Sequence, residues 1–366
     1  MTNPDPALDD ALRRLLPAVE AALQAFLSHP PAAPDELALE SGAGPDRARG
    51  GAAAAHYGMM RYHLGWLDED LAPARAPTGK RLRPVLCLLA AEACGDDSGK
   101  AMPAAVALEL LHNFSLIHDD IEDHDDVRHH RPTVWKLWGQ AQGINVGDGM
   151  HVLAYLALQP LTAHGLTPET ALRLLSLLAR TSLTITEGQH LDLAFERRDD
   201  VAPADYLDMI ARKSAALLSC SAAIGAGVAG AREEWSAALA RYGHLLGMAF
   251  QIRDDVLGIW GRSEKTGKPA GDLYRKKKSL PSLYALSRAE GRHEAALRAL
   301  FDADSPGDEA VQHALAALDA TGARRHCEQM VVHYSSGAQT HLATLPPSPA
   351  RDALEALTLQ LQHRES

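Results

Sequence analysis

The sequence predicts an all-α protein built as a single domain, and three observations lead to that prediction. Apolar residues recur at three- and four-residue intervals along nearly the whole chain, which is the spacing of one helix face. Alternating Val, Ile and Thr segments joined by hairpin turns, which indicate strands, do not stand out. The chain also shows no repeat of fixed length, which argues against a solenoid. We therefore expect a bundle of helices.

The helical pattern gives the order of the elements. It begins with an amphipathic segment whose apolar positions are Leu8, Leu12, Leu15, Leu16, Val19 and Leu23. Residues 29–55, rich in Pro, Ala and Gly, predict a flexible connection. The pattern resumes at 56–71, and a basic turn at 79–84 opens the next helix with Pro84 in its first turn. Further helices are predicted at 101–128, 133–143, 146–163, 168–195, 203–230 and 233–260 and, after a basic loop at 262–278, in Ala/Leu-rich segments to the end. We divide the chain into an N-terminal helix with its flexible segment, 1–55, and a helical domain, 56–366.

Composition excludes several classes of protein. The 366 residues include 36 Lys+Arg and 47 Asp+Glu, a formal charge of −11, whereas nucleic-acid-binding proteins normally carry a basic excess. Four cysteines form no CxxC pair, and the N-terminus has no apolar run. Two long uncharged stretches, 149–168 and 214–231, are too weakly apolar to favour spanning a bilayer. We expect a cytoplasmic protein with no nucleic-acid partner and no stable membrane insertion.

An acidic segment at 108–123 is the most informative part of the chain. Asp119 and Asp123 are one helical turn apart, so both carboxylates lie on one face, while apolar neighbours bury the other. Paired carboxylates bind Mg²⁺ and leave positions for substrate phosphates. A solvated acidic helix end would explain this segment alone equally well.

A second segment repeats the design. Gln251 lies three and four residues before Asp254 and Asp255, so the amide and both acids converge on a helix. A loop with two glycines, a proline and lysines follows, and the run 276–278 is entirely lysine. Phosphate bridged by metal ions explains both acidic pairs and the basic clusters together. A glycosidase would need the carboxylates but would leave the lysines and Arg83 unexplained.

With these motifs the chain resembles the trans-isoprenyl diphosphate synthases of the polyprenyl synthetase family, from about residue 56 to 286. The resemblance implies antiparallel helices around a deep central cavity, usually in a homodimer. It implies the joining of isopentenyl diphosphate to an allylic diphosphate with Mg²⁺, about three ions per active site. Matched residue by residue, the metal ligands are Asp119, Asp120, Asp123, Asp254 and Asp255. The matched substrate contacts are Lys80, Arg83, His112 and His129 for isopentenyl diphosphate, and Arg128, Lys213, Ser214, Gln251, Lys268 and Lys277 for the allylic diphosphate.

The resemblance gives catalytic roles to Asp119, Asp123, Asp254 and Lys213, and it makes the released diphosphate the base that takes the final proton. Three positions depart from the family pattern: Thr78 and Gly258 replace a glycine and an aspartate, and His129 replaces an arginine. Histidine lacks the bidentate fork of arginine and is mostly neutral near pH 7. At position 129 it would weaken isopentenyl diphosphate binding or make it pH-dependent.

Product length is predicted from the turn beneath the first motif. Helical side chains lean toward the N-terminus, so Phe114 and Ser115 lie where a growing chain would point, and Leu111 could form the floor. This combination resembles family members that make twenty-carbon products, so a geranylgeranyl product is expected, with farnesyl next. Phe114 could equally be an ordinary core residue.

Two smaller signals have ordinary explanations. Gln189 and Asp192 match a family motif, but a polar pair in helix packing explains them nearly as well. Histidines crowd the first motif without the spacing of a zinc site.

Two other functions compete with chain elongation. A terpene synthase of the same fold would ionise and cyclise a single prenyl diphosphate, and His129 favours it. The set Lys80, Arg83 and His112 argues against it, because a cyclase needs no second diphosphate site. A non-catalytic subunit is expected to lose its metal ligands, and both acidic pairs are present here.

Overall fold

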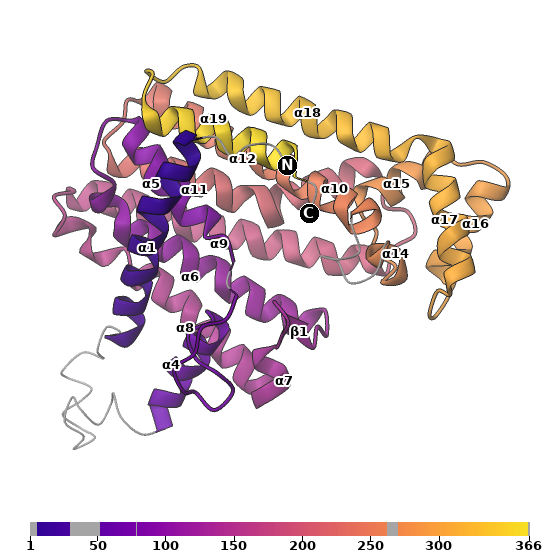
Figure 1. The fold of residues 1–366 in the computed structure, drawn as a ribbon, viewed down its shortest axis with the longest axis horizontal. Coiled ribbons are helices and arrows are strands. Elements are labelled where there is room, and N and C mark those ends of the chain that lie inside the picture. The colour runs from indigo at the N-terminus through magenta and orange to yellow at the C-terminus, as the bar shows by residue number, and fades with distance from the viewer. Residues whose placement is uncertain (1–5, 30–51, 78, 262–269, 365–366) are drawn as a thin grey trace. The chain divides into compact units, whose positions relative to one another are not determined.

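The predicted all-α class is confirmed by the structure, a computed structural model that describes residues 6–29, 52–77, 79–261 and 270–364. Within these ranges the strands are two short ones, β1 (Val127–Arg128) and β2 (Arg131–Pro132), paired antiparallel (Figure 1). The rest of the ordered structure is helical. Thr78 and Lys268 lie outside the described residues. No helix in the described ranges is long and apolar enough to cross a membrane, and all four cysteines are free thiols.

The chain packs as two compact units, which we describe separately. The N-terminal unit comprises the described residues from 10 to 179 and 227–229; the C-terminal unit comprises those before 10, from 180 to 226, and from 230 onward. This division differs from the one expected near residue 55, because most of the first helix packs within the N-terminal unit.

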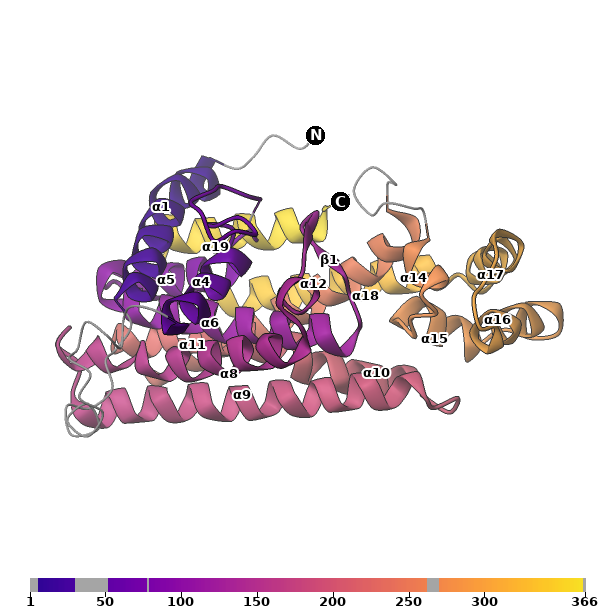
Figure 2. The same cartoon turned by 90° about the horizontal axis from the view of Figure 1, so that it is seen from below.

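The N-terminal unit is built around one long helix. Its elements are α1 (Pro6–Ser28, from residue 10), α4 (Ala52–His63), α5 (Leu82–Ala93), α6 (Ser98–Glu122), the strands β1 and β2, α7 (Val134–Trp138), α8 (Gln140–Leu156), the 3₁₀ turn η1 (Gln159–Thr162) and the first part of α9 (Pro168–Glu196). Helix α6 packs against α5 and α8 (Figure 2). Its Leu108, Leu110 and Leu111 are fully buried, so α6 is the central helix of this unit.

A buried arginine joins three helices of the N-terminal unit. Arg81, which precedes α5 in a left-handed conformation (φ 48°), donates 2.8 Å hydrogen bonds to Glu20 of α1 and Glu109 of α6. Its side chain and that of Glu109 are only 4% and 3% exposed. Buried charges require this kind of pairing, so the contact fixes α1 to the core. The first helix is therefore part of a packed unit.

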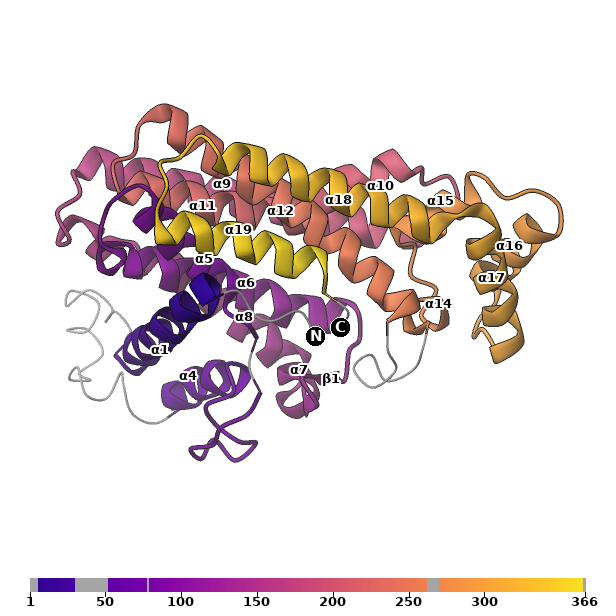
Figure 3. The ribbon, with the colours of Figure 1, turned by 45° about the horizontal axis from the view of Figure 1, so that its top comes forward.

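The C-terminal unit is dominated by two long helices that lie side by side, α12 (Glu233–Trp260) and α18 (Ala323–Leu342), with α19 (Pro349–Gln362) against both (Figures 1 and 3). Its other elements are the rest of α9, α10 (Pro203–Ile210), the π-helical turn η2 (Ala211–Ala215), α11 (Ala216–Val228), α14 (Gly271–Tyr274), α15 (Leu280–Leu286), α16 (Arg292–Asp302) and α17 (Asp308–Thr321). Helices α16 and α17 pack on each other around Leu297 and Leu300.

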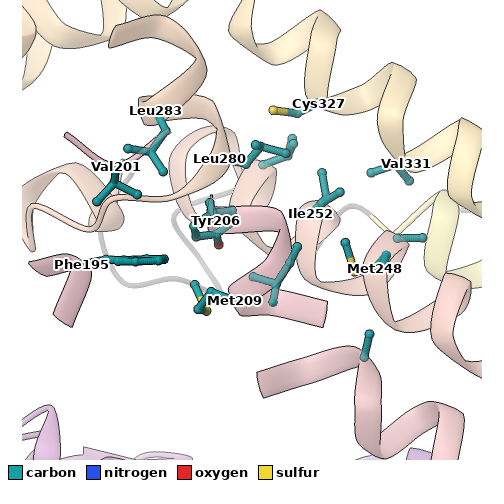
Figure 4. Close-up of a cluster of buried hydrophobic side chains, with 14 residues drawn as sticks. Phe195, Val201, Tyr206, Met209, Met248, Ile252, Leu280, Leu283, Cys327 and Val331 are labelled. Carbon is teal, nitrogen blue, oxygen red and sulfur yellow. The ribbon is translucent and has the colours of Figure 1, made fainter. Parts of the chain in front are cut away.

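A cluster of buried side chains holds α10, α12, α15 and α18 together (Figure 4). Tyr206, Ile252 and Leu280 meet there, and Val331 contributes from α18. Ile252 and Val256, on either side of the second acidic motif, belong to this cluster, so the packed core holds that part of α12 in place.

Replacing Arg81 by Ala is expected to destabilise the protein by about 3 kcal/mol or more, because Glu109 would be left buried without its cation. The measurement is the free energy of unfolding in urea. Arg14→Ala is the matched control: Arg14 of α1 pairs with Glu92 of α5, but its side chain is 54% exposed, so the loss should stay near 1 kcal/mol or below. Equal losses in the two variants would contradict the buried role of Arg81.

Candidate functional site

The first acidic motif lies at the C-terminal end of α6. Asp119 is half-buried, Asp123 is exposed and ends the helix, and the Asp123 N–H donates to the Asp119 carbonyl at 2.8 Å. The motif thus places one carboxylate inside the last turn and one at the surface, one turn apart as predicted.

Asp120 has different surroundings from its two partners. It is 1% exposed and accepts a 2.7 Å hydrogen bond from Nε of Arg128, the arginine predicted to grip the allylic diphosphate. Burial raises the pKa of Asp120 to about 6, against the opposing effect of Arg128. The structure therefore ties Arg128 to the first motif through Asp120. Their predicted roles toward substrate and metal remain predictions.

The strands β1 and β2 form a tight hairpin with His129 and His130 at its tip. Both histidines have left-handed backbones (φ 50° and 63°), the conformation that two-residue hairpin turns require. Residues other than glycine adopt this conformation uncommonly. The hairpin fixes Arg128 on one side and exposes the His129 ring. Burial and the charge of Arg128 lower the pKa of His129, so it is neutral at pH 7.

Arginines and neutral histidines gather beneath this hairpin. Burial first, and then Arg128, Arg81 and His129, lower the pKa of His63 to about 3. The pKa of His112 falls for the same reason, first by burial and then by Arg83 and Arg128. Burial is the largest cause of both shifts, and the neighbouring arginines add to it. His63, Asp120, Arg128 and His129 also line a pocket floored by Tyr62 and Val134. Of the predicted isopentenyl diphosphate contacts, Arg83 is half-buried at the start of α5 and Lys80 is exposed just before it.

The three residues predicted to set product length are buried or half-buried on α6. Phe114 is 5% exposed, stacks on His151 of α8 with ring centroids 4.4 Å apart, and meets His118 edge-on. Ser115 donates its hydroxyl to the His112 carbonyl at 2.8 Å, and Leu111 is fully buried. Phe114 thus belongs to a wall made by side chains of α6 and α8.

In the C-terminal unit, Asp255 is a buried carboxylate with several donors. It is 1% exposed and accepts hydrogen bonds from the Tyr206 hydroxyl (2.7 Å), the Gln251 amide (3.2 Å) and the Leu280 N–H (3.3 Å). Burial raises its pKa to about 6, and Lys277 and these donors oppose the rise. The predicted convergence of Gln251 and Asp255 is present.

Asp254, one residue earlier, points to a different partner. Arg364, just beyond α19, donates from Nη1 to its carboxylate at 2.7 Å. The neighbouring Arg253 donates to the Gln362 carbonyl at 2.6 Å. The C-terminal end of the described chain is therefore held against the second motif, a contact that sequence spacing gives no signal for.

The π-helical turn η2 carries Lys213 and Ser214. Lys213 donates to Asp192 of α9 at 2.6 Å, and Ser214 donates to the side-chain oxygen of Gln251 at 2.7 Å. Ser214, Gln251 and Asp255 thus form one hydrogen-bonded chain, and the Lys213–Asp192 pair starts from the neighbouring residue of η2. Such turns are frequent at functional sites, and this one places two predicted substrate contacts beside the second motif.

Two glycines hold η2 in place. A Cβ on Gly188 of α9 would lie 2.7 Å from Cα of Lys213, and one on Gly247 of α12 would lie 2.5 Å from Cα of Ala215. Only glycine permits such contacts, in which the backbone of one helix lies against that of another. In the segment 188–192 of α9, Gly188 and Asp192 are therefore the two residues whose contacts with η2 are defined here.

Within the described residues, no three His, Cys, Asp or Glu side chains are placed to hold a metal by themselves. The residues nevertheless fit Mg²⁺, which takes one or two carboxylates together with waters and substrate phosphates. Asp119 and Asp123, one turn apart on α6, are a donor pair of that kind, whereas Asp254 faces Arg364 and Asp255 accepts from three donors of its own.

Three residues of these surroundings were not predicted from the sequence: His63, Tyr206 and Asp272. Asp272 is buried at 6% exposure near Lys277. An acid four residues before the lysine run 276–278 was the only available signal for Asp272. His63 and Tyr206 gave none, because their partners are distant in the sequence: Tyr206 donates to Asp255, 49 residues away, and His63 lies near Asn113 and Arg128.

Residues 65–318 match the family model described as polyprenyl synthetase. The chain is 41% identical over 315 residues to a geranylgeranyl diphosphate synthase of Mycobacterium tuberculosis, covering 84% of this chain and 86% of that protein. It is 46% identical over 241 residues to a (2E,6E)-farnesyl diphosphate synthase of the same organism, covering 65% of this chain and 66% of the relative's length. A crystal structure of a polyprenyl synthetase from Streptomyces coelicolor superposes with a TM-score of 0.82 at 33% identity, over 98% and 99% of the two chains.

Replacing His63 by Gln is expected to flatten the acid dependence of stability. A histidine whose folded pKa is lowered contributes stability above its unfolded pKa of 6.5 and loses it as pH falls toward about 3, at up to about 1.4 kcal/mol per pH unit. The measurement is the free energy of unfolding at pH 7, 6 and 5. The exposed His164→Gln is the control, and a His63→Gln profile as steep as the wild type would contradict this account.

Proposed function

Because the chain belongs to the polyprenyl synthetase family, we propose that it is a prenyltransferase that joins isopentenyl diphosphate to an allylic diphosphate. The predicted family and fold class are confirmed. The named relatives are farnesyl and geranylgeranyl diphosphate synthases, which favours chain elongation over the alternative of a terpene synthase. The proposed product is geranylgeranyl diphosphate, with farnesyl diphosphate as the second candidate.

The observation that carries this proposal is the gathering of arginines and histidines in the N-terminal unit, where His63, Arg128 and His129 line one pocket. Three histidines there have lowered pKa values, and arginines contribute to each shift. Arg81 and Arg128 are paired with acids, and the neutral histidines beside them can offer imidazole N–H donors to a diphosphate. A cyclase with one diphosphate substrate has no use for this cluster in addition to Lys213, Gln251 and Lys277.

The proposed chemistry divides among the residues of the two motifs. The family uses Mg²⁺, and here Asp119, Asp123, Asp254 and Asp255 would hold it, with Asp120 orienting Arg128. When bound, the metal neutralises diphosphate charge as the allylic carbon–oxygen bond breaks. Lys213 and Lys277 add ammonium groups, and apolar walls such as the one containing Phe114 exclude water from the allylic cation. The isopentenyl double bond then attacks the cation, and the released diphosphate takes the proton.

A homodimer in the cytoplasm is part of the proposal. Ile144 and Val152 of α8 are eight residues apart, and both are exposed, at 43% and 57%. Leu172 of α9, in the same unit, is 62% exposed. We propose that self-association of two chains covers these exposed apolar side chains.

The experiment that tests the function separates elongation from cyclisation. The purified protein is incubated with Mg²⁺ and dimethylallyl, geranyl or farnesyl diphosphate, with and without isopentenyl diphosphate. The products are identified by mass spectrometry. Longer prenyl diphosphates formed only with isopentenyl diphosphate support the proposal. Hydrocarbons or alcohols from a single allylic substrate would replace it with a cyclase.

Phe114→Ala is expected to lengthen the product by at least one five-carbon unit, because it opens the wall between α6 and α8 below the first motif. The measurement is the product chain length by mass. Phe301→Ala, which removes a partly buried aromatic ring from α16, is the control and should leave the length unchanged. An unchanged product in Phe114→Ala would contradict the assignment of this wall.

His129→Arg is expected to lower KM for isopentenyl diphosphate by about tenfold, because a charged hydrogen bond contributes roughly 1.5–3 kcal/mol and His129 is neutral at pH 7. KM for the allylic substrate should change little. His130→Arg, at the other tip position of the same turn, is the control for added charge. Equal effects in the two variants would show a general electrostatic effect and would contradict a specific contact at position 129.

A further inference from the structure

Lys276, the first residue of the lysine run 276–278, binds the end of a helix. Its backbone is left-handed (φ 54°), a conformation that residues other than glycine adopt uncommonly. Its Nζ donates at 2.6 Å to the carbonyl of Ala303, the residue that caps the C-terminal end of α16. Two residues earlier, the Tyr274 hydroxyl donates to Asp308 of α17 at 2.7 Å. The segment is therefore tied to the α16–α17 pair at two points, and Lys276 makes a contact that a glycine could not make.

Lys278, the last residue of the run, binds the end of a different helix. Its Nζ donates at 3.3 Å to the carbonyl of Glu196, the last residue of α9, and also to the carbonyl of Arg198 just beyond it. The Asp199 carboxylate lies 3.5 Å from the same nitrogen. The Lys278 side chain is only 12% exposed, so these contacts are largely shielded from water.

Both contacts use the same property of helices. The last carbonyls of a helix have no N–H partner within it and carry a partial negative charge, so an ammonium group binds there favourably. Lys276 and Lys278 are thus anchored to the C-terminal ends of two helices that come from distant parts of the chain.

Lys277 lies between the two anchored residues and is the most exposed of the three lysines. Its N–H donates to the Asp272 carbonyl at 2.8 Å, and its own carbonyl accepts the Ser279 N–H at 2.9 Å. The Leu280 N–H donates to the Asp255 carboxylate at 3.3 Å, which sets the register of the run against the second acidic motif. The main chain is therefore held on both sides of the lysine that a ligand can reach.

We propose that Lys276 and Lys278 are positioning residues that hold the run to the ends of α16 and α9, so that the Lys277 ammonium group is oriented toward the diphosphate of the allylic substrate. This inference rests on the proposed function, in which Lys277 contacts that diphosphate. It gives different roles to three identical side chains, because two bind the backbone of the protein and one binds the ligand. The effect of the anchors on ligand binding should therefore depend on Lys277.

The first measurement is hydrogen exchange of residues 277–280 in the whole chain without ligand. Lys276→Met and Lys278→Met keep a long side chain but remove the donor, so each should exchange faster than the wild type. Lys276→Arg and Lys278→Arg can still donate to the same carbonyls and should keep exchange slow. Arg275→Met removes an exposed cation of the same segment and is the control, with unchanged exchange. Wild-type exchange rates in both methionine variants would overturn the inference.

The second measurement is calorimetric binding of a thiodiphosphate analogue of the allylic substrate, which does not ionise, in the presence of Mg²⁺. Lys277→Met should bind about tenfold more weakly, because a charge-assisted hydrogen bond is lost. Lys276→Met combined with Lys278→Met should lose a similar factor. In the triple variant the two anchor substitutions should cost nothing beyond Lys277→Met, since they act through that residue. If they weaken binding by the same factor with and without Lys277, they act only through general charge, and the inference is wrong.

Two outcomes separate this inference from the proposed function. If Lys277→Met binds the analogue like the wild type, the inference is overturned even where the wild type elongates prenyl chains. Wild-type protein that binds the analogue but does not elongate would overturn the proposed function and leave the comparison of the lysine variants intact.

Discussion

The organisation of the C-terminal unit depends on a carboxylate that is kept out of water. Burying Asp255 would be costly without partners, and its partners come from three helices: the hydroxyl of Tyr206 on α10, the amide of Gln251 on α12 itself and the first N–H of α15. Each donor is fixed in turn by the apolar cluster around Ile252 and Leu280. The position of the acidic motif therefore depends directly on the packing of the core beneath it.

The N-terminal unit solves a related problem with the opposite charge. Arg81 is neutralised by Glu20 and Glu109, and Arg128 is held by Asp120. His63 and His112 lie beside these arginines and remain uncharged. The buried arginines are thus paired with acids. The histidines beside them fill space as neutral side chains, so they need no further acids.

Helical periodicity predicted the long elements well, and it failed where backbone geometry departs from a regular helix. The segments expected at 168–195 and 233–260 correspond closely to α9 and α12. The helix expected at 101–128 ends at Glu122, because the hairpin after it uses two left-handed histidines and lacks the Asn-Gly or Asp-Gly signal. The segment at 203–230 contains a π-helical turn that no residue pattern announces.

At the site, the sequence likewise predicted contacts within one helix but not contacts between distant segments. Residues one helical turn apart, such as Gln251 and Asp255, were predicted to converge and do so. Contacts between distant segments were beyond it. Glu20 reaches Arg81 across 61 positions, and Arg364 reaches Asp254 across 110. Charge pattern identifies which groups need partners, but the tertiary fold decides which partners they receive.

The glycines at η2 have a consequence for how this chain could diverge. At Gly188 and Gly247 any mutation adds an atom against another backbone, so the segment with Lys213 and Ser214 has almost no room to drift. The contact between Phe114 and His151 is made by two side chains, which can shrink or grow in compensating steps. Lineages descended from this protein would thus diversify along the α6–α8 wall, while the polar network of the C-terminal unit would persist nearly unaltered.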